Sequence, residues 1–137
     1  GHQTGDAVLC PLVNRISQHL RTRDLLGRFG GEEFTLLLPG LDSEQARPVA
    51  ERIRHGISQA PWRLAGETIS LTASLGVACS QHHGYDFNTL LGAADAALYR
   101  AKTLGRNRVE LAPPPGQTDQ EQVALRLLSQ FSHNLDV

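Results

Sequence analysis

A glycine pair followed by two acidic residues is the part of this 137-residue chain best suited to chemistry. Gly30 and Gly31 precede Glu32 and Glu33, between two short apolar runs. This arrangement predicts a tight hairpin whose glycines let a ligand approach the backbone. Successive strand residues point to opposite faces, so at most one glutamate faces a given ligand. A carboxylate there can bind Mg²⁺ together with substrate phosphates, although a solvated hairpin tip uses the same residues.

Two further pairs of charged residues have spacings that suit phosphate or base binding. Lys102 and Arg106 are four residues apart at the end of a predicted helix, so they are expected to share one face of its last turn. They either complement the helix dipole or hold a triphosphate. Arg21 and Asp24 form either a surface ion pair of little energetic weight or a site where arginine holds a guanine edge or a phosphate.

The composition limits what kind of partner is expected. The chain has 13 basic and 14 acidic residues, a net charge of −1, which argues against a DNA- or RNA-binding protein that neutralises many phosphates. Cys10 and Cys79 lie outside any CxxC spacing and do not predict a zinc site or a disulfide scaffold. The sequence has no apolar run long enough to span a membrane and starts without a signal-like leader. We therefore expect a cytoplasmic domain, with an anchor elsewhere in a full-length protein left open.

The apolar periodicity predicts helices and strands in alternation. Ser43 is the expected N-cap of the second helix and Asp86 or Asn88 that of the third, which ends at Gly105. The order α-β-β-α-β-α-β predicts one sheet covered by helices, an α/β or α+β sandwich. The expected helices span about 4–20, 43–58 and 86–104, and the expected strands 25–29, 34–38, 69–79 and 108–111, with a possible edge hairpin at 64–67.

A proline-rich stretch at 112–118 predicts a linker after a domain at 1–111. Its three consecutive prolines favour an extended spacer. The segment 119–137 is predicted to form an amphipathic helix, which either packs on its own domain or pairs with another chain. The apolar residues on one face of that helix would be Ala124, Leu127, Leu128, Phe131 and Leu135.

Several motifs, taken in order, resemble the diguanylate cyclase family, the GGDEF domain in its GGEEF form. They are GHQTGDAVL at 1–9, RFGGEEF at 28–34, SLGVA at 74–78 and ADAALYRAK followed by GRN within 94–107. The resemblance extends from residue 1 to about 111. It implies a central, mostly antiparallel sheet flanked by helices, the ferredoxin-like palm of nucleotidyl cyclases.

The resemblance also implies a reaction. Family members condense two GTP into cyclic di-GMP and two pyrophosphates, with one GTP on each of two facing domains, so a homodimer is expected. Two divalent metal ions, Mg²⁺ or Mn²⁺, hold the triphosphate and activate the attacking 3′-hydroxyl. Positioning and charge neutralisation account for most of such catalysis.

Site residues follow from the resemblance position by position. Glu32 is the implied metal ligand and helps deprotonate the 3′-hydroxyl, and Glu33 is the second acidic residue of the catalytic signature. Lys102 and Arg106 would hold the terminal phosphates, and Asp6 would accept hydrogen bonds from the guanine amino edge. Gly30 and Gly31 would let the backbone pass close to the nucleotide.

The family also has an RxxD motif five residues before its signature. Arg21 and Asp24 have this spacing, and Arg52 resembles the supporting arginine. By resemblance, these three residues would bind cyclic di-GMP and cause product inhibition.

The first strand of the family, with its DxDxFKxxND stretch, is absent from this chain. That stretch supplies a second metal-binding aspartate and an asparagine that reads guanine. Loss of this central strand is expected to leave exposed sheet edges, so we expect the chain alone to fold poorly and not to cyclise GTP. Three functions stay open: an active cyclase whose front end lies elsewhere, an inactive module that binds GTP or cyclic di-GMP, and a dimerisation tail at 119–137.

Overall fold

The structure, a computed structural model, describes residues 2–28, 33–59, 61–64, 66–83, 86–113 and 122–132, without the side chains of 2–9, 82–83 and 122–132. The helices are α1 (His2–Ser17), α2 (Ser43–Ser58), α3 (Ser80–His83) and α4 (Phe87–Thr103). The strands are β1 (Leu25–Arg28), β2 (Glu33–Pro39), β3 (Trp62–Leu64), β4 (Glu67–Cys79), β5 (Val109–Leu111) and β6 (Gln122–Ser132).

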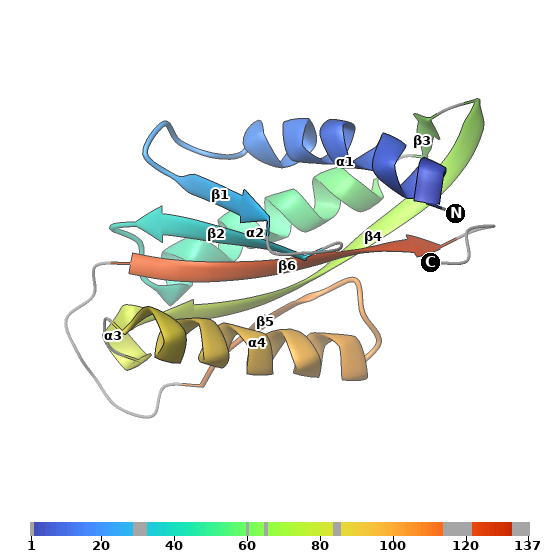
Figure 1. Ribbon diagram of the computed structural model, residues 1–137. Helices are drawn as coiled ribbons and strands as arrows, with labels where there is room; N and C mark the ends of the chain where they lie inside the picture. Colours follow the sequence, from blue (N-terminus) through green and yellow to red (C-terminus); the bar gives the residue numbers. More distant parts are fainter. Residues whose placement is uncertain are drawn as a thin grey trace.

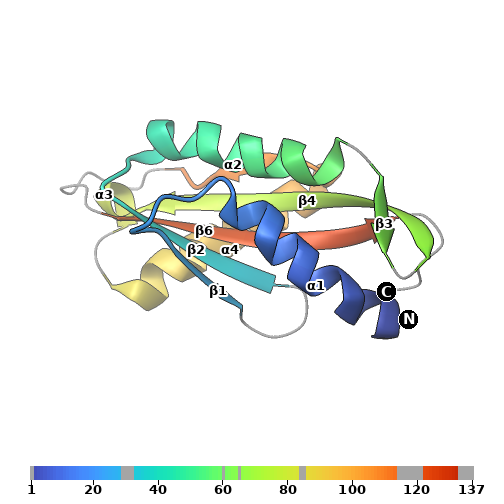
Figure 2. The same ribbon diagram turned by 90° about the horizontal axis from the view of Figure 1, so that it is seen from above.

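The strands of the described residues form a mostly antiparallel sheet in the order β1-β2-β6-β4-β3. β5 pairs with β4 in parallel, and the other ladders are antiparallel. Helices α1 and α2 cover one face of the sheet and α4 the other, as the two views show (Figure 1, Figure 2). This α+β arrangement confirms the predicted fold class.

The apolar periodicity of the sequence corresponds to the observed core. On α2, Ala46, Ala50, Ile53 and Ile57 are fully buried against the sheet, as their three- and four-residue spacing predicts. The opposite face is covered by the small side chains of α4, which form a second cluster with Ala78 of β4. Small residues there allow the helix to lie close to the strand.

Asp42, one residue before the predicted Ser43, is the N-cap of α2. Its Oδ1 accepts a hydrogen bond of 2.8 Å from the Gln45 amide, and the Gln45 Oε1 accepts one of 2.9 Å from the Asp42 amide. This reciprocal capping box satisfies two amides, whereas Ser43 lies inside the first turn. At α4, the first of the two predicted alternatives, Asp86, is the N-cap.

The prediction of a helix over 119–137 is wrong for its described part, because residues 122–132 form strand β6. β6 lies between β2 and β4, with Leu125 opposite both Leu36 and Val77. The expectation of exposed edges at the centre of the sheet is therefore also wrong. The physical reason is that both neighbouring strands need a ladder partner, which a helix cannot supply. The proposed ends of the domain and linker stay predictions.

Candidate functional site

The predicted hairpin is confirmed by the pairing of β1 with β2. Arg28, the last residue of β1, lies opposite Phe34, and Glu33 is the half-buried first residue of β2. Gly30, Gly31 and Glu32 lie outside the described residues. The described strand ends nevertheless fix where the chain leaves and re-enters the sheet around this motif.

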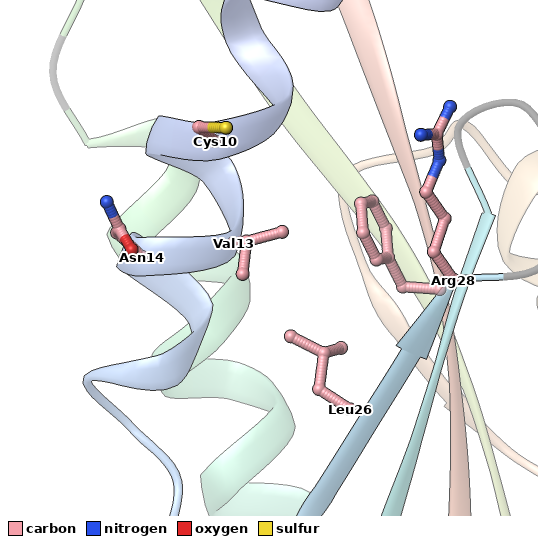
Figure 3. A pocket seen from close by; sticks show the side chains of 6 residues that line it. Cys10, Val13, Asn14, Leu26 and Arg28 are labelled. Carbon is pink, nitrogen blue, oxygen red and sulfur yellow. The ribbon is translucent and has the colours of Figure 1, made fainter.

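A pocket with a volume of about 360 Å³ lies between α1 and the hairpin. Figure 3 shows Val13 of α1 and Leu26 of β1 turned toward each other across it, while the Arg28 guanidinium extends beyond them. Apolar walls with a few polar groups are typical of small-ligand sites. The lining residues are Cys10, Val13, Asn14, Leu26, Arg28 and Phe34.

The lining of the pocket by α1 was not anticipated from the sequence, although a signal for it was present. Asp6, whose backbone is part of α1, precedes Cys10 by four residues and Asn14 by eight. Residues spaced in this way lie along one helix face. The position predicted to read guanine is therefore on the same face of α1 as the pocket, one turn away from Cys10.

The predicted phosphate-binding cations lie at the C-terminal end of α4. Lys102 is half-buried in the last turn. Arg106 is exposed and lies beyond the helix with a φ of 64°, so the prediction that both residues share one face of the last turn is wrong. Gly105, with a φ of 126°, makes the chain leave the helix axis here. In Figure 1 this end of α4, the start of β2 and the N-terminal half of α1 all lie toward the same side of the molecule.

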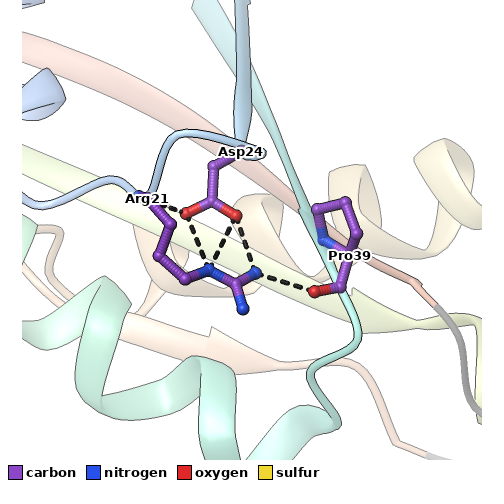
Figure 4. A network of polar contacts seen from close by, with 3 residues as sticks. All are labelled: Arg21, Asp24 and Pro39. Carbon is purple, nitrogen blue, oxygen red and sulfur yellow. Dashed lines mark hydrogen bonds and ion pairs between the residues drawn. The ribbon is translucent and has the colours of Figure 1, made fainter.

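Arg21 and Asp24 form a closely bonded pair at the opposite end of β1 (Figure 4). Arg21 Nη2 donates to Asp24 Oδ1 at 2.7 Å and to the carbonyl oxygen of Pro39 at 2.7 Å, and Arg21 Nε donates to Asp24 Oδ1 at 3.0 Å. The Asp24 side chain is only 3% exposed, against 36% for Arg21. The pair therefore fixes the loop before β1 to the end of β2, which an exposed surface pair does not do.

This pairing changes the acidity of both groups. Burial alone would raise the pKa of Asp24, but its hydrogen bonds with the side chain and amide of Arg21, and the charges of Arg21 and Arg23, lower that pKa overall. The pKa of Arg21 is raised by the same hydrogen bond. Both groups are charged at neutral pH, and the arginine already has a carboxylate partner.

Arg52 is exposed on α2, near the end of α1. Burial lowers the pKa of His19, and the positive charges of Arg52 and Arg15 lower it further. Arg15 lies over the ring of Trp62 at 4.4 Å and donates to the Gly56 carbonyl at 2.6 Å. Basic groups thus collect where α1 meets α2.

In the part of the chain that the structure describes, no group of three or more His, Cys, Asp or Glu side chains is placed to hold a metal ion. Residues 122–132, the central strand, contain no Asp or Glu. Among the described residues of the hairpin, the carboxylate is that of Glu33. No helix within the described residues is long and apolar enough to cross a membrane.

Comparison with known proteins gives consistent matches. The family described as "Diguanylate cyclase, GGDEF domain" matches residues 1–108. The diguanylate cyclase DgcP of Pseudomonas aeruginosa is 40% identical over 112 residues, which are 82% of this chain and 16% of DgcP. The probable diguanylate cyclase DgcT of Escherichia coli is 41% identical over 115 residues, 80% of this chain and 25% of DgcT. The chain thus spans a quarter or less of these two relatives.

Solved structures give the same result for the fold. The GGDEF domain of YfiN (TpbB) from Pseudomonas aeruginosa has a TM-score of 0.78 and 39% identity, covering 82% of this chain and 71% of that chain. A structure described as the active GGEEF domain of a diguanylate cyclase from Vibrio cholerae has a TM-score of 0.66 and 32% identity, with coverage of 82% and 71%. Both are cyclase palm domains similar to this α+β fold.

Proposed function

Because the chain belongs to the diguanylate cyclase family, as a GGDEF domain, we propose that it binds GTP at the β1–β2 hairpin and, paired with a second copy, condenses two GTP into cyclic di-GMP and pyrophosphate. The observation that carries this proposal is the pocket between α1 and the hairpin. It has apolar walls, it lies beside the GGEEF motif, and its volume of about 360 Å³ suits a nucleobase with part of its ribose.

In the proposed complex, each of these residues has its own role. The base enters between Val13 and Leu26, with Asp6 accepting hydrogen bonds from its amino edge. Gly30 and Gly31 admit the sugar and phosphates close to the backbone. The attacking 3′-hydroxyl comes from the nucleotide on the facing copy, so the domain's main contribution is to fix orientation.

The triphosphate extends from the pocket toward the positive charges at the end of α4. Lys102 acts as a point charge and Arg106 as a forked donor for the terminal oxygens. Neutralising these oxygens favours departure of pyrophosphate, since negative charge accumulates on the leaving group.

The hairpin suits Mg²⁺ or Mn²⁺ better than a softer metal. Glu32 and Glu33 offer oxygen donors only, and Mg²⁺ is normally bound by one or two carboxylates together with substrate phosphates and water. When bound, such an ion would supply charge neutralisation at the phosphates and a more acidic 3′-hydroxyl. The residues present are enough for this kind of shared site, although they form no all-protein cage.

We further propose that Arg21, Asp24 and Arg52 bind the product and cause product inhibition. Arg21 already donates to Asp24 and Pro39, so its guanidinium is oriented before any ligand arrives. A preorganised arginine loses less conformational freedom on binding a phosphate or guanine edge. The exposed Arg52 would provide a second positive charge for the phosphodiester.

One observation favours a second candidate, an inactive module that binds GTP or cyclic di-GMP. β6 occupies the centre of the sheet, and residues 122–132 contain no acidic side chain. The family resemblance implies a metal-binding aspartate on a central strand of the sheet, the place that β6 takes in this structure. A chain in this state would hold nucleotides without condensing them.

The test is to incubate the chain with GTP and Mg²⁺, separate products by chromatography, and titrate GTP and ATP by calorimetry. An active cyclase yields one cyclic di-GMP per two pyrophosphates, with loss of turnover in Glu32→Gln and none in Glu44→Gln, an exposed residue of α2. GTP binding without turnover supports the binding module. Equal affinity for GTP and ATP, or no binding of either, refutes the cyclase and a module that binds GTP.

A further inference from the structure

The turn that follows α4 is connected by hydrogen bonds to two other elements. The Asn107 amide donates to Ser74 Oγ of β4 at 3.2 Å, and the Asn107 Oδ1 accepts from Arg54 Nη1 of α2 at 2.9 Å. Ser74 is completely buried. One residue of this exposed turn is therefore held by a strand and by a helix that lies on the other face of the sheet.

The backbone of this turn is unusual for the residues it contains. Arg106 has a φ of 64° and Asn107 a φ of 47°, both in the left-handed region. Asparagine tolerates this region, but arginine rarely adopts it. Such a conformation persists where surrounding contacts impose it. The contacts made by Asn107 are thus expected to determine the direction in which the neighbouring Arg106 leaves the chain.

The rest of the turn is fixed at both ends. The Arg106 amide donates to the Ala101 carbonyl at 2.8 Å, which ties the turn to the last part of α4. The Leu75 amide donates to the Arg108 carbonyl at 2.9 Å, which ties the following residue to β4. Between these two anchors, the side chain of Asn107 makes the contact to α2.

Arg54 is itself held in place. Its Nε donates to Glu51 Oε2 at 3.1 Å, and its side chain is only 22% exposed. One nitrogen of the planar guanidinium is therefore bonded to Glu51 and another to Asn107. A planar group fixed at one nitrogen presents the others in a defined direction, so Arg54 acts as a rigid support.

We propose that Asn107 is a positioning residue for Arg106, and that Arg54 and Ser74 hold it in this role. The inference rests on the proposed function, in which Arg106 contacts the terminal phosphates of GTP. In this proposal, Asn107 and Arg54 are hydrogen-bonded to each other and neither contacts the nucleotide. Their effect is to orient the Arg106 guanidinium before the nucleotide binds, and preorganisation of this kind strengthens binding to the group that it faces. This preorganisation therefore strengthens binding of the triphosphate and leaves binding of the base unchanged.

The experiment compares the affinities of the chain for GTP and for GMP by calorimetry in the presence of Mg²⁺. Asn107→Gly removes the side chain and keeps the left-handed backbone accessible, and Arg54→Met removes the donor. Each is expected to weaken GTP binding by up to about tenfold, because Arg106 is then ordered only when GTP binds, with GMP affinity unchanged. Since both variants remove the same contact, the double variant is expected to be no weaker than either single one.

Arg47→Met is the matched control, because Arg47 is exposed on the same helix and its loss removes the same charge. It is expected to leave the ratio of GTP to GMP affinity at the wild-type value. The inference is overturned if Asn107→Gly or Arg54→Met leaves that ratio unchanged, if Arg47→Met lowers it equally, or if the two losses add in the double variant. A wild-type chain that binds GTP no better than GMP refutes the phosphate role of Arg106 itself, and the proposed function with it.

Discussion

Gly76 of β4 lies against the backbone of α4, so closely that a Cβ at position 76 would stand 2.9 Å from the Cα of Leu98. The same Cβ would also meet the Ala94 carbonyl oxygen and the Leu98 amide nitrogen. These are backbone atoms of a helix and cannot move aside as a flexible side chain does. The glycine of the SLGVA motif is therefore explained by close packing of β4 against the middle of α4.

We expect Gly76→Ala to destabilise the chain by about 3 kcal/mol, because the added methyl forces α4 away from the sheet. Chemical denaturation followed by circular dichroism measures this change. Gly92→Ala is the matched control, since Gly92 lies in α4 with no atom within 4 Å of an added Cβ. It is expected to stabilise the helix by roughly 0.5–1 kcal/mol. Equal effects of the two substitutions would contradict the close contact at Gly76.

The pair formed by Arg21 and Asp24 predicts a linked loss of stability and of product binding. Arg21→Ala leaves a nearly buried carboxylate without its guanidinium partner, which costs about 1–3 kcal/mol. It also removes the guanidinium that we propose binds cyclic di-GMP. Thermal unfolding measures the loss of stability, and calorimetric titration with cyclic di-GMP measures the loss of product binding. Arg63→Ala, at an exposed position of β3, is the control and is expected to change neither. Unchanged affinity for cyclic di-GMP in Arg21→Ala would eliminate the product site.

His19 predicts a pH dependence of stability. Its pKa in the folded chain is lowered below 6.5 by burial and by Arg52 and Arg15, so the unfolded chain takes up the proton first as pH falls. The free energy of unfolding is therefore highest above pH 6.5. It decreases as pH falls through 6.5 toward the folded pKa. Thermal unfolding between pH 5 and 8 measures this, and His19→Gln is expected to flatten the curve.

The control for this measurement is His55→Gln, at an exposed position of α2. It is expected to keep the acid-dependent loss of stability seen in the wild-type chain. A His19→Gln variant with the wild-type slope would show that another group is responsible.

Local patterns predicted the hairpin, α2 and α4 because each has a periodic apolar face and a cap or glycine at its end. The segment 122–132 was misassigned because its apolar residues fit two periods. Leu127, Leu128 and Phe131 have helical spacing, whereas Val123, Leu125 and Leu127 alternate as in a strand. Short apolar runs are ambiguous in this way. Whether this segment forms a helix or a strand depends on β2 and β4. Both have backbone N–H and C=O groups that need hydrogen-bond partners, and a strand between them supplies these partners.

Contacts between distant residues were not predictable for a different reason. Arg54 and Asn107 are 53 residues apart, and each taken alone is an exposed polar residue on a surface element. The left-handed backbone at Arg106 likewise has no signal in an Arg-Asn dipeptide beyond the preceding glycine. That Lys102 and Arg106 bind phosphate stays a prediction from the sequence, whereas the contact that we propose to orient Arg106 is found only in the packing of α2 and β4 around the turn.

The register of β6 predicts a specific disulfide. Val123 lies opposite Cys79 of β4, and opposed residues of antiparallel strands have Cα atoms about 4.5–5.5 Å apart, within the range that a disulfide spans. Val123→Cys is therefore expected to form an intramolecular bond to Cys79. The exposed Cys10 is replaced by serine to prevent other pairings. Because burial raises the pKa of the Cys79 thiol, oxidation is carried out during refolding and followed by non-reducing electrophoresis and peptide mapping.

Ala124→Cys in the same background is the control, because Ala124 lies opposite Ala78, and neighbouring strand residues point to opposite faces. It is expected to remain unlinked to Cys79. A bond from position 123 within one chain supports β6 as the central strand between β2 and β4, because the pairing of β6 with β4 places residue 123 opposite Cys79. A bond joining two chains would mean that β6 completes the sheet of a second copy. Equal linkage to Cys79 from positions 123 and 124, or no linkage from either, would contradict the register. The central strand of the sheet would then be a segment other than β6.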